Sequence, residues 1–97
     1  MKWFADGKER SKKALQLLNA LYDSFSDNSD EKPAKDLIAK YISQLKNPRT
    51  SVPFILNAFN LKVAKCLREN EIQLSSEQSS KFKQLRELSN IKYGSSI

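Results

Sequence analysis

The side chains that most often perform covalent chemistry are scarce in this sequence. Of its 97 residues one is a cysteine, Cys66, and none is a histidine. Histidine is the usual general base and a frequent zinc ligand, so its absence removes the common catalytic triads and most zinc sites. An enzyme built on this chain would need Cys66 together with some other activating group.

Cys66 lies within an apolar helical pattern, one turn after Val63 and beside Leu67. Helical spacing directs the adjacent Lys65 away from the thiol. We therefore interpret Cys66 as a small hydrophobic residue of the core, and we expect no catalytic residues and no cofactor. Catalysis by Cys66 is the alternative, and loss of an activity in Cys66→Ser would reveal it.

Acidic residues gather after the first apolar pattern, at Asp23, Asp27, Asp30 and Glu31. Carboxylates in such numbers can hold a divalent cation, but these lack the Asp-x-Asp-x-Asp-Gly spacing of a calcium loop. Helix capping and solvation account for them better. No metal site is expected.

Four stretches of the chain carry apolar residues at steps of three and four, which is the periodicity of amphipathic helices. The predicted helices cover about residues 8–25, 31–46, 51–69 and 76–92. Short connections between helices favour antiparallel neighbours. We predict an all-α fold, an antiparallel up-down-up-down four-helix bundle that forms a single domain over residues 1–97, with a flexible tail at 94–97.

Local signals mark several helix ends. A serine and an aspartate at residues 29–30 are the predicted cap of the second helix, and Ser75 with Gln78 forms a capping-box pattern at the start of the fourth. Between the third and fourth helices, Ile72 and Leu74 are expected to pack inward. These two residues would hold the connection against the core.

The charge of the chain is strongly basic, with a formal net charge of +6. Residues 37–68 contain six basic residues and no acid, whereas the acids fall mainly at 23–36 and 69–77. Such a surface attracts lipid headgroups or nucleic acid. A small basic helical nucleic-acid-binding or regulatory protein is the alternative function. No nucleic-acid-binding motif appears, so nucleic acid is not the expected partner.

The expected cellular location of the protein follows from segments that the sequence lacks. No stretch approaches the ~18–20 apolar residues that span a bilayer, and residues 1–8 contain no apolar core of a signal peptide. A lone cysteine fits a reducing compartment. We expect a cytoplasmic protein, with peripheral contact at the inner face of the cell membrane as a further expectation.

Four residues are the candidate contacts with a membrane or a receptor. Trp3 and Phe4 precede the first helix, next to Lys2, in a combination typical of membrane interfaces. Lys62 and Lys65 lie in the acid-free segment. The bundle exterior is thereby expected to meet an anionic membrane.

Three motifs in the second half of the chain occur together and in order. They are the Val-Pro-x-Ile-Leu start at residues 52–56, the Ile-x-Leu-Ser-x-x-Gln helix entry at 72–78 and the Ile-Lys-Tyr-Gly exit at 91–94. With them, residues 50–94 resemble the immunity proteins of pediocin-like (class IIa) bacteriocins, and the enterocin A immunity group in particular. The first half agrees in length, charge and helix pattern.

This resemblance implies a four-helix bundle that protects a bacterium from a pediocin-like bacteriocin. In that family the partner is the membrane part of the mannose phosphotransferase permease in complex with bacteriocin, which the immunity protein binds from the cytosolic side to block a leak. The resemblance also places specificity in the C-terminal half. The corresponding residues are Lys81, Lys83, Arg86, Lys92, Tyr93 and Ile97. Ser95 and Ser96 stand where relatives often carry another aromatic residue.

Overall fold

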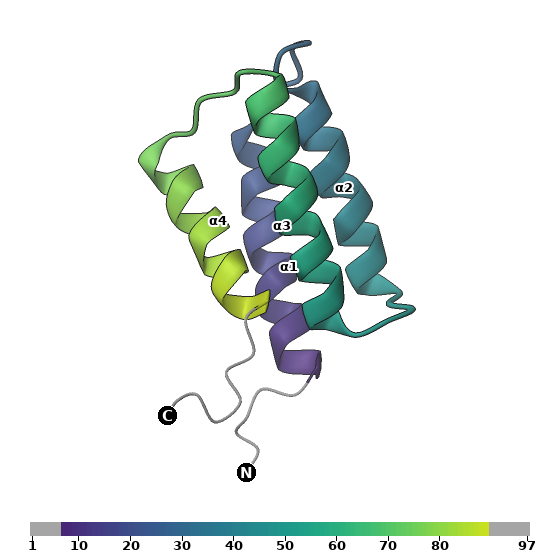
Figure 1. The fold of residues 1–97 in the computed structure, drawn as a ribbon. Coiled ribbons are helices and arrows are strands. Elements are labelled where there is room, and N and C mark those ends of the chain that lie inside the picture. The colour runs from purple at the N-terminus through teal and green to yellow at the C-terminus, as the bar shows by residue number, and fades with distance from the viewer. Residues whose placement is uncertain (1–6, 90–97) are drawn as a thin grey trace.

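The computed structural model describes residues 7–89, and for Gly7 and Lys8 only the backbone. The described chain forms four helices, α1 (Gly7–Ser24), α2 (Lys32–Lys46), α3 (Val52–Glu69) and α4 (Ser76–Ser89), and no strand. Successive helices run in opposite directions along the bundle (Figure 1). The predicted all-α bundle is confirmed. Within the described part of the chain, no helix has both the length and the apolar character needed to cross a membrane.

The helices lie at the four corners of the bundle, and of the two diagonal pairs only α1 and α3 touch within the described residues. α1 packs against α2 and α4, and α3 packs against the same two helices from the other side. In residues 7–89, α2 and α4 make no contact with each other because they lie diagonally across the bundle. Each helix therefore buries one apolar stripe and leaves an outer face free for solvent or a partner.

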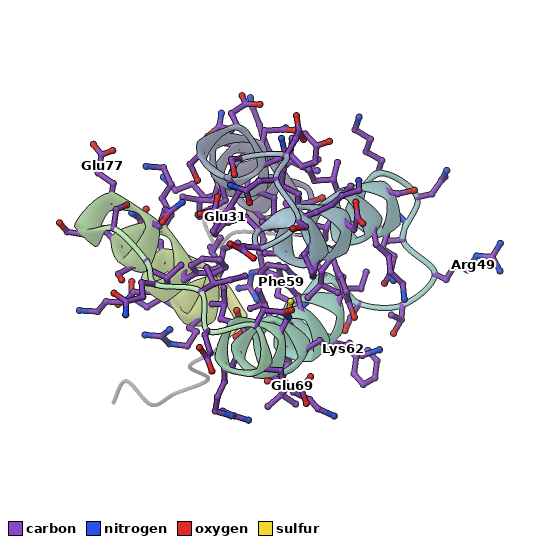
Figure 2. All side chains as sticks on the ribbon, turned by 90° about the horizontal axis from the view of Figure 1, so that it is seen from above. Glu31, Arg49, Phe59, Lys62, Glu69 and Glu77 are labelled. Atoms are coloured by element: carbon purple, nitrogen blue, oxygen red, sulfur yellow. The ribbon has the colours of Figure 1, made fainter. Side chains whose placement is uncertain are left out.

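The core uses the apolar positions that the periodicity predicts. Its fully or nearly fully buried members are Ala14, Leu17, Leu18, Leu21, Phe25, Ala34, Ile38, Tyr41, Leu45, Val52, Ile55, Leu56, Phe59, Val63, Phe82 and Leu85. Phe59 of α3 lies at the centre of the bundle (Figure 2). Because each helix contributes at least two of these residues, no helix can leave without opening the core.

A chain of aromatic rings crosses the core and joins all four helices. The rings of Tyr41 and Phe59 lie 5.3 Å apart between their centroids, and those of Phe59 and Phe82 lie 6.2 Å apart, nearly parallel. Phe25, which follows α1, completes the chain at 6.4 Å from Phe82. Such pairs add about 0.5–1.5 kcal/mol each beyond their buried area. Phe82 thus ties α4 to both α1 and α3.

The start of α2 differs from the prediction. Neither residue 29 nor residue 30 caps the helix, and the residue at the cap position, Glu31, makes no side-chain cap bond. Asn28 supplies the acceptors instead: its Oδ1 accepts from the Glu31 N–H at 3.2 Å, and its carbonyl accepts from the Lys32 N–H at 3.0 Å. A turn over residues 28–31 precedes α2. The residue that supplies these acceptors, Asn28, therefore lies three positions before the cap position at Glu31.

The end of α3 has the hydrogen bonds of a Schellman motif. The Ile72 N–H donates to the Leu67 carbonyl at 2.9 Å, and the Glu71 N–H donates to the Arg68 carbonyl at 3.3 Å. Glu71 adopts a φ of 54°, in the left-handed region that favours glycine. Ile72 and Leu74 pack against the core, as predicted. This turn fixes the direction in which the chain leaves α3 toward α4.

Candidate partner surface

The fourth helix carries three of the candidate partner residues, Lys81, Lys83 and Arg86, and packs on the bundle through a narrow buried stripe. Only Gln78, Phe82 and Leu85 of α4 are buried, at spacings of four and three, while most of its other side chains are exposed. A helix that buries so few residues presents most of its circumference outward. α4 is therefore the most accessible element of the described bundle for a partner.

Gln78 fixes the start of α4 in two ways. The predicted capping box is confirmed: the Ser75 N–H donates to Gln78 Oε1 at 2.9 Å, and the Gln78 N–H donates to Ser75 Oγ at 3.1 Å. In addition, Gln78 Nε2 donates to the hydroxyl and the carbonyl of Ser24 at 2.9 and 3.3 Å. The same amide thus caps α4 and ties it to the end of α1, a contact that the local capping pattern does not reveal.

A second polar contact holds the other end of the helix. Asn60 of α3 donates from Nδ2 to Ser89 Oγ at 3.2 Å, and this hydroxyl donates in turn to the Arg86 carbonyl at 2.8 Å. Together with Gln78 it sets the position of α4 at both ends. The exposed side chains between them are accordingly presented on a fixed helix.

The structure divides the basic residues that were predicted to form one surface. Lys83 and Arg86 are exposed, whereas Lys81 is half-buried. At 100° per residue, Lys81 lies about 140° from Arg86 around the helix axis, so the two occupy opposite flanks of α4. Arg86 lies on the flank that faces α3. Lys83 and Arg86 belong to one surface, and Lys81 does not.

The remaining predicted contacts fall outside this surface or outside the described part of the chain. Lys92, Tyr93, Ile97, Trp3 and Phe4 lie outside residues 7–89. Their proposed roles are therefore untested by the structure.

Arg86 borders a small pocket between α3 and α4. The pocket has a volume of about 110 Å³ and is mostly apolar. Its lining residues are Asn60, Val63, Ala64, Leu67, Leu74, Phe82 and Arg86. A dry cavity of about 150 Å³ can hold a benzene ring, so this pocket suits one smaller apolar side chain, with a guanidinium at its edge. The sequence contains no signal for it, because it forms where the connection at Leu74 meets two helices.

Lys62 and Lys65 belong to a different face. Both are exposed on α3, and Lys62 points outward from the bundle, away from Phe59 (Figure 2). Lys65 Nζ lies 3.9 Å from Glu69 Oε2, a distance and exposure at which an ion pair contributes little. The α3 flank that borders α4 is formed by other residues. Lys62 and Lys65 therefore do not join Lys83 and Arg86.

The α1–α2 and α3–α4 connections lie at the same end of the bundle (Figure 1), and most acidic residues of the described chain belong to these connections or to the adjoining helix ends. A polar pocket there has Asp30 and Glu71 among its lining residues. Nearby, Asp27 pairs with Lys35 at 3.1 Å, and the ammonium of Lys35 lies 4.4 Å from the centre of the Tyr22 ring. Among residues with described side chains, no three His, Cys, Asp or Glu residues are arranged to hold a metal ion.

Cys66 is less buried than predicted. It lies half-buried at the edge of the core, where its Sγ accepts a hydrogen bond from Asn70 Nδ2 at 3.6 Å. Burial raises the pKa of the Cys66 thiol, the hydrogen bond from Asn70 opposes this rise, and the Glu69 carboxylate adds to it. A thiol with a raised pKa is protonated at neutral pH and is a poor nucleophile. This position suits a packing role.

The fold and the surface define a small four-helix bundle with a largely exposed fourth helix. The chain belongs to the Bacteriocin immunity protein family, which it matches over residues 11–90. It is also 33% identical, over 60 residues, to a protein of Carnobacterium maltaromaticum described as an uncharacterised 9.1 kDa protein in the BM1 immunity protein 3′ region. That match covers 62% of this chain and 74% of the relative.

Two solved structures share the fold over nearly their whole length. One is an immunity protein that contributes to the self-protection of bacteriocin-producing Enterococcus mundtii 15-1A, with a TM-score of 0.80 and 27% identity, over 87% of this chain and 99% of that one. The other is PisI, solved by NMR in solution, with a TM-score of 0.77 and 39% identity, over 97% of this chain and 96% of that one. The predicted family is confirmed.

Proposed function

We propose that this protein protects a bacterium from a pediocin-like bacteriocin by binding the membrane subunits of the mannose phosphotransferase permease once the bacteriocin occupies them. Binding takes place from the cytosolic side and blocks the leak through the permease. The protein acts as a binding partner and transforms no substrate.

The observation that carries this proposal is the match to the Bacteriocin immunity protein family over residues 11–90. The likeness to the Enterococcus mundtii protein supports it, because that protein contributes to the self-protection of a bacteriocin producer. The permease as partner rests on the resemblance of residues 50–94 to the immunity proteins of pediocin-like bacteriocins.

The surface that we propose for specificity lies on the α3 side of α4. Lys83 and Arg86 are exposed there, and Arg86 stands at the edge of the α3–α4 pocket. An apolar pocket bordered by a guanidinium combines an apolar contact with a directional hydrogen-bond donor, as binding surfaces commonly do. We propose that Lys92, Tyr93 and Ile97, which lie outside the described residues, also contribute to partner specificity.

Cellular location forms part of the proposal. The protein works in the cytoplasm at the inner face of the cell membrane, where the permease lies. Trp3 and Phe4 would contribute apolar contacts at that interface, which the fluorescence of the single tryptophan can report.

Expression of the chain in a bacteriocin-sensitive strain tests the function. We expect growth in the presence of at least one member of a panel of pediocin-like bacteriocins, with no protection from an empty vector. Immunoblotting and far-UV circular dichroism of the purified protein establish that it is present and folded. Full sensitivity to the whole panel, with folded protein in the cells, would overturn the proposal.

A further inference from the structure

The outward face of α3 carries two large apolar side chains that the core does not use. Phe54 is 63% exposed and Leu61 is 68% exposed, whereas the other large apolar residues with described side chains are buried or half-buried. A single exposed apolar residue needs no explanation. Two exposed apolar residues on one helix face, seven positions apart, do need an explanation.

Basic residues share this face. Helical spacing places Lys65 and Arg68 in line with Phe54 and Leu61, and places Lys62 at the edge of the same stripe. All three basic side chains are exposed. From residue 54 to residue 68 the stripe is about 21 Å long, at a rise of 1.5 Å per residue. We call the five residues together the α3 outer face.

The surroundings of the α3 outer face are almost free of negative charge. Residues 37–68 include no acid, and Lys46 and Arg49, which precede α3, are also exposed. Figure 2 shows Arg49 and Lys62 pointing away from the core on the side opposite Glu77. Glu69 follows the stripe, and its carboxylate lies 3.9 Å from Lys65 Nζ. With this one carboxylate counted against Lys62, Lys65 and Arg68, a net charge of +2 remains.

The α3 outer face is separate from the pocket beside α4. The pocket is lined from α3 by Asn60, Val63, Ala64 and Leu67, none of which belongs to the outer face. One helix therefore offers two different surfaces, an apolar pocket on the α4 side and a basic, apolar stripe facing outward. A partner at one leaves the other accessible.

We propose that the α3 outer face docks the protein on an anionic lipid bilayer. Phe54 and Leu61 enter the boundary between headgroups and acyl chains, and Lys62, Lys65 and Arg68 contact lipid phosphates. This proposal deepens the location given under the proposed function and rests on that function only for its biological setting. Lipid binding itself requires neither bacteriocin nor permease.

Charge complementarity favours a bilayer as the occupant. An amphipathic helix with basic residues beside exposed apolar ones binds in the plane of an anionic interface. Each lysine or arginine near such a surface adds an electrostatic attraction that salt weakens. Their side chains are long enough to reach the lipid phosphates while the apolar groups are buried in the membrane. The α3 outer face has both kinds of residue, basic and exposed apolar, along one side of the helix.

Sedimentation of the full chain with unilamellar vesicles tests the proposal. We expect binding to vesicles of equal parts phosphatidylglycerol and phosphatidylcholine, and at least roughly tenfold weaker binding to phosphatidylcholine alone. Removal of two charges in K62Q/K65Q should weaken binding to the anionic vesicles about 30-fold. The matched control is K12Q/K13Q, which removes two exposed lysines from α1, diagonally across the bundle. It should bind within about threefold of the native chain.

Insertion of the apolar residues needs its own measurement. In a Trp3→Phe background, Phe54→Trp should show blue-shifted emission and quenching by lipids brominated on their acyl chains, whereas Lys12→Trp should show neither. Equal effects of the α3 and α1 charge variants, or unquenched emission from the Phe54→Trp variant, would overturn the proposal. So would binding that appears only in membranes containing the permease, which would assign the face to a protein partner. Protection in cells is measured separately, so failure here leaves the proposed function standing.

Discussion

Glu71 holds a backbone conformation that its side chain disfavours. Its φ of 54° allows the two Schellman hydrogen bonds that end α3. An L-residue with a Cβ pays about 1 kcal/mol in this region relative to glycine. The turn is kept by the bonds at Ile72 and by the packing of that residue on the core.

Glu71→Gly is expected to stabilise the protein. Relief of the backbone conformation should raise the free energy of unfolding by about 0.5–1 kcal/mol, measured by urea denaturation. Glu71→Ala is the control, because it removes the carboxylate but retains the Cβ, and it should bring no such gain. Equal stabilisation by both variants would show that charge, and not backbone conformation, was responsible.

The Cys66 thiol predicts a dependence on alkaline pH. Since burial raises its pKa in the folded state, the folded protein keeps this proton to higher pH than the unfolded chain does. The resulting stabilisation is complete below about pH 8.5, the ordinary thiol pKa, and is lost as the pH rises through the folded pKa. The difference in unfolding free energy between the native protein and Cys66→Ala should therefore decrease above that pH.

Alkylation gives an independent measurement of the same thiol. At pH 8.5, iodoacetamide should react more slowly with the folded protein than with the protein unfolded in urea. Faster reaction of the folded protein would mean an activated thiol and would revive the interpretation of Cys66 as a nucleophile.

The hydrogen bonds from Gln78 to Ser24 connect α4 to the end of α1 and help to fix the position of the fourth helix. Gln78 is buried, caps its own helix and donates to Ser24. Its loss would leave polar groups of both helices without partners. The position of Lys83 and Arg86 therefore depends on a residue that does not belong to the exposed surface.

Gln78→Ala is expected to lower the free energy of unfolding by about 2 kcal/mol, from a lost cap and two lost hydrogen bonds. Hydrogen exchange should increase most in α4. Gln78→Glu retains an acceptor for the Ser75 N–H but cannot donate to Ser24. It should therefore lower the free energy of unfolding by less than Gln78→Ala does. An unchanged exchange rate in α4 of Gln78→Ala would contradict this role.

Changes at the proposed partner residues and changes in the core should have different effects on protection. Arg86→Glu should preserve the helical circular dichroism and alter the protection or the range of bacteriocins resisted; Tyr93→Ala should do the same. Leu85→Ala should cost roughly 2–5 kcal/mol and abolish protection through unfolding. Unchanged protection by Arg86→Glu and Tyr93→Ala would show that the specificity surface is wrongly placed, with the family unaffected.

The helices were predictable because their apolar positions repeat so regularly. The described ends of α1, α2 and α3, and the start of α4, lie within one residue of the predicted ones. The cap of α2 was not predictable in this way, because a turn lies between Asn28 and the first residue of the helix. The division between Lys81 and Arg86 also escaped prediction: spacing gives their angle around the helix, but only packing shows which flank meets α3.

At the scale of the whole molecule, the arrangement separates three regions. The acidic connections gather at one end, the pocket and Arg86 lie between α3 and α4, and the α3 outer face is basic and apolar. The four-helix architecture and the family could be predicted from the sequence. The pocket could not, since it depends on how two helices and the connection at Leu74 meet in three dimensions.

Capture from detergent-solubilised membranes tests the central claim most directly. The tagged native chain, incubated with membranes of a sensitive strain, should retain the mannose permease subunits when a bacteriocin that it protects against is present, and retain little when it is absent. Arg86→Glu should reduce this retention while remaining folded. Retention that is equal with and without bacteriocin, or absent in both, would contradict the account.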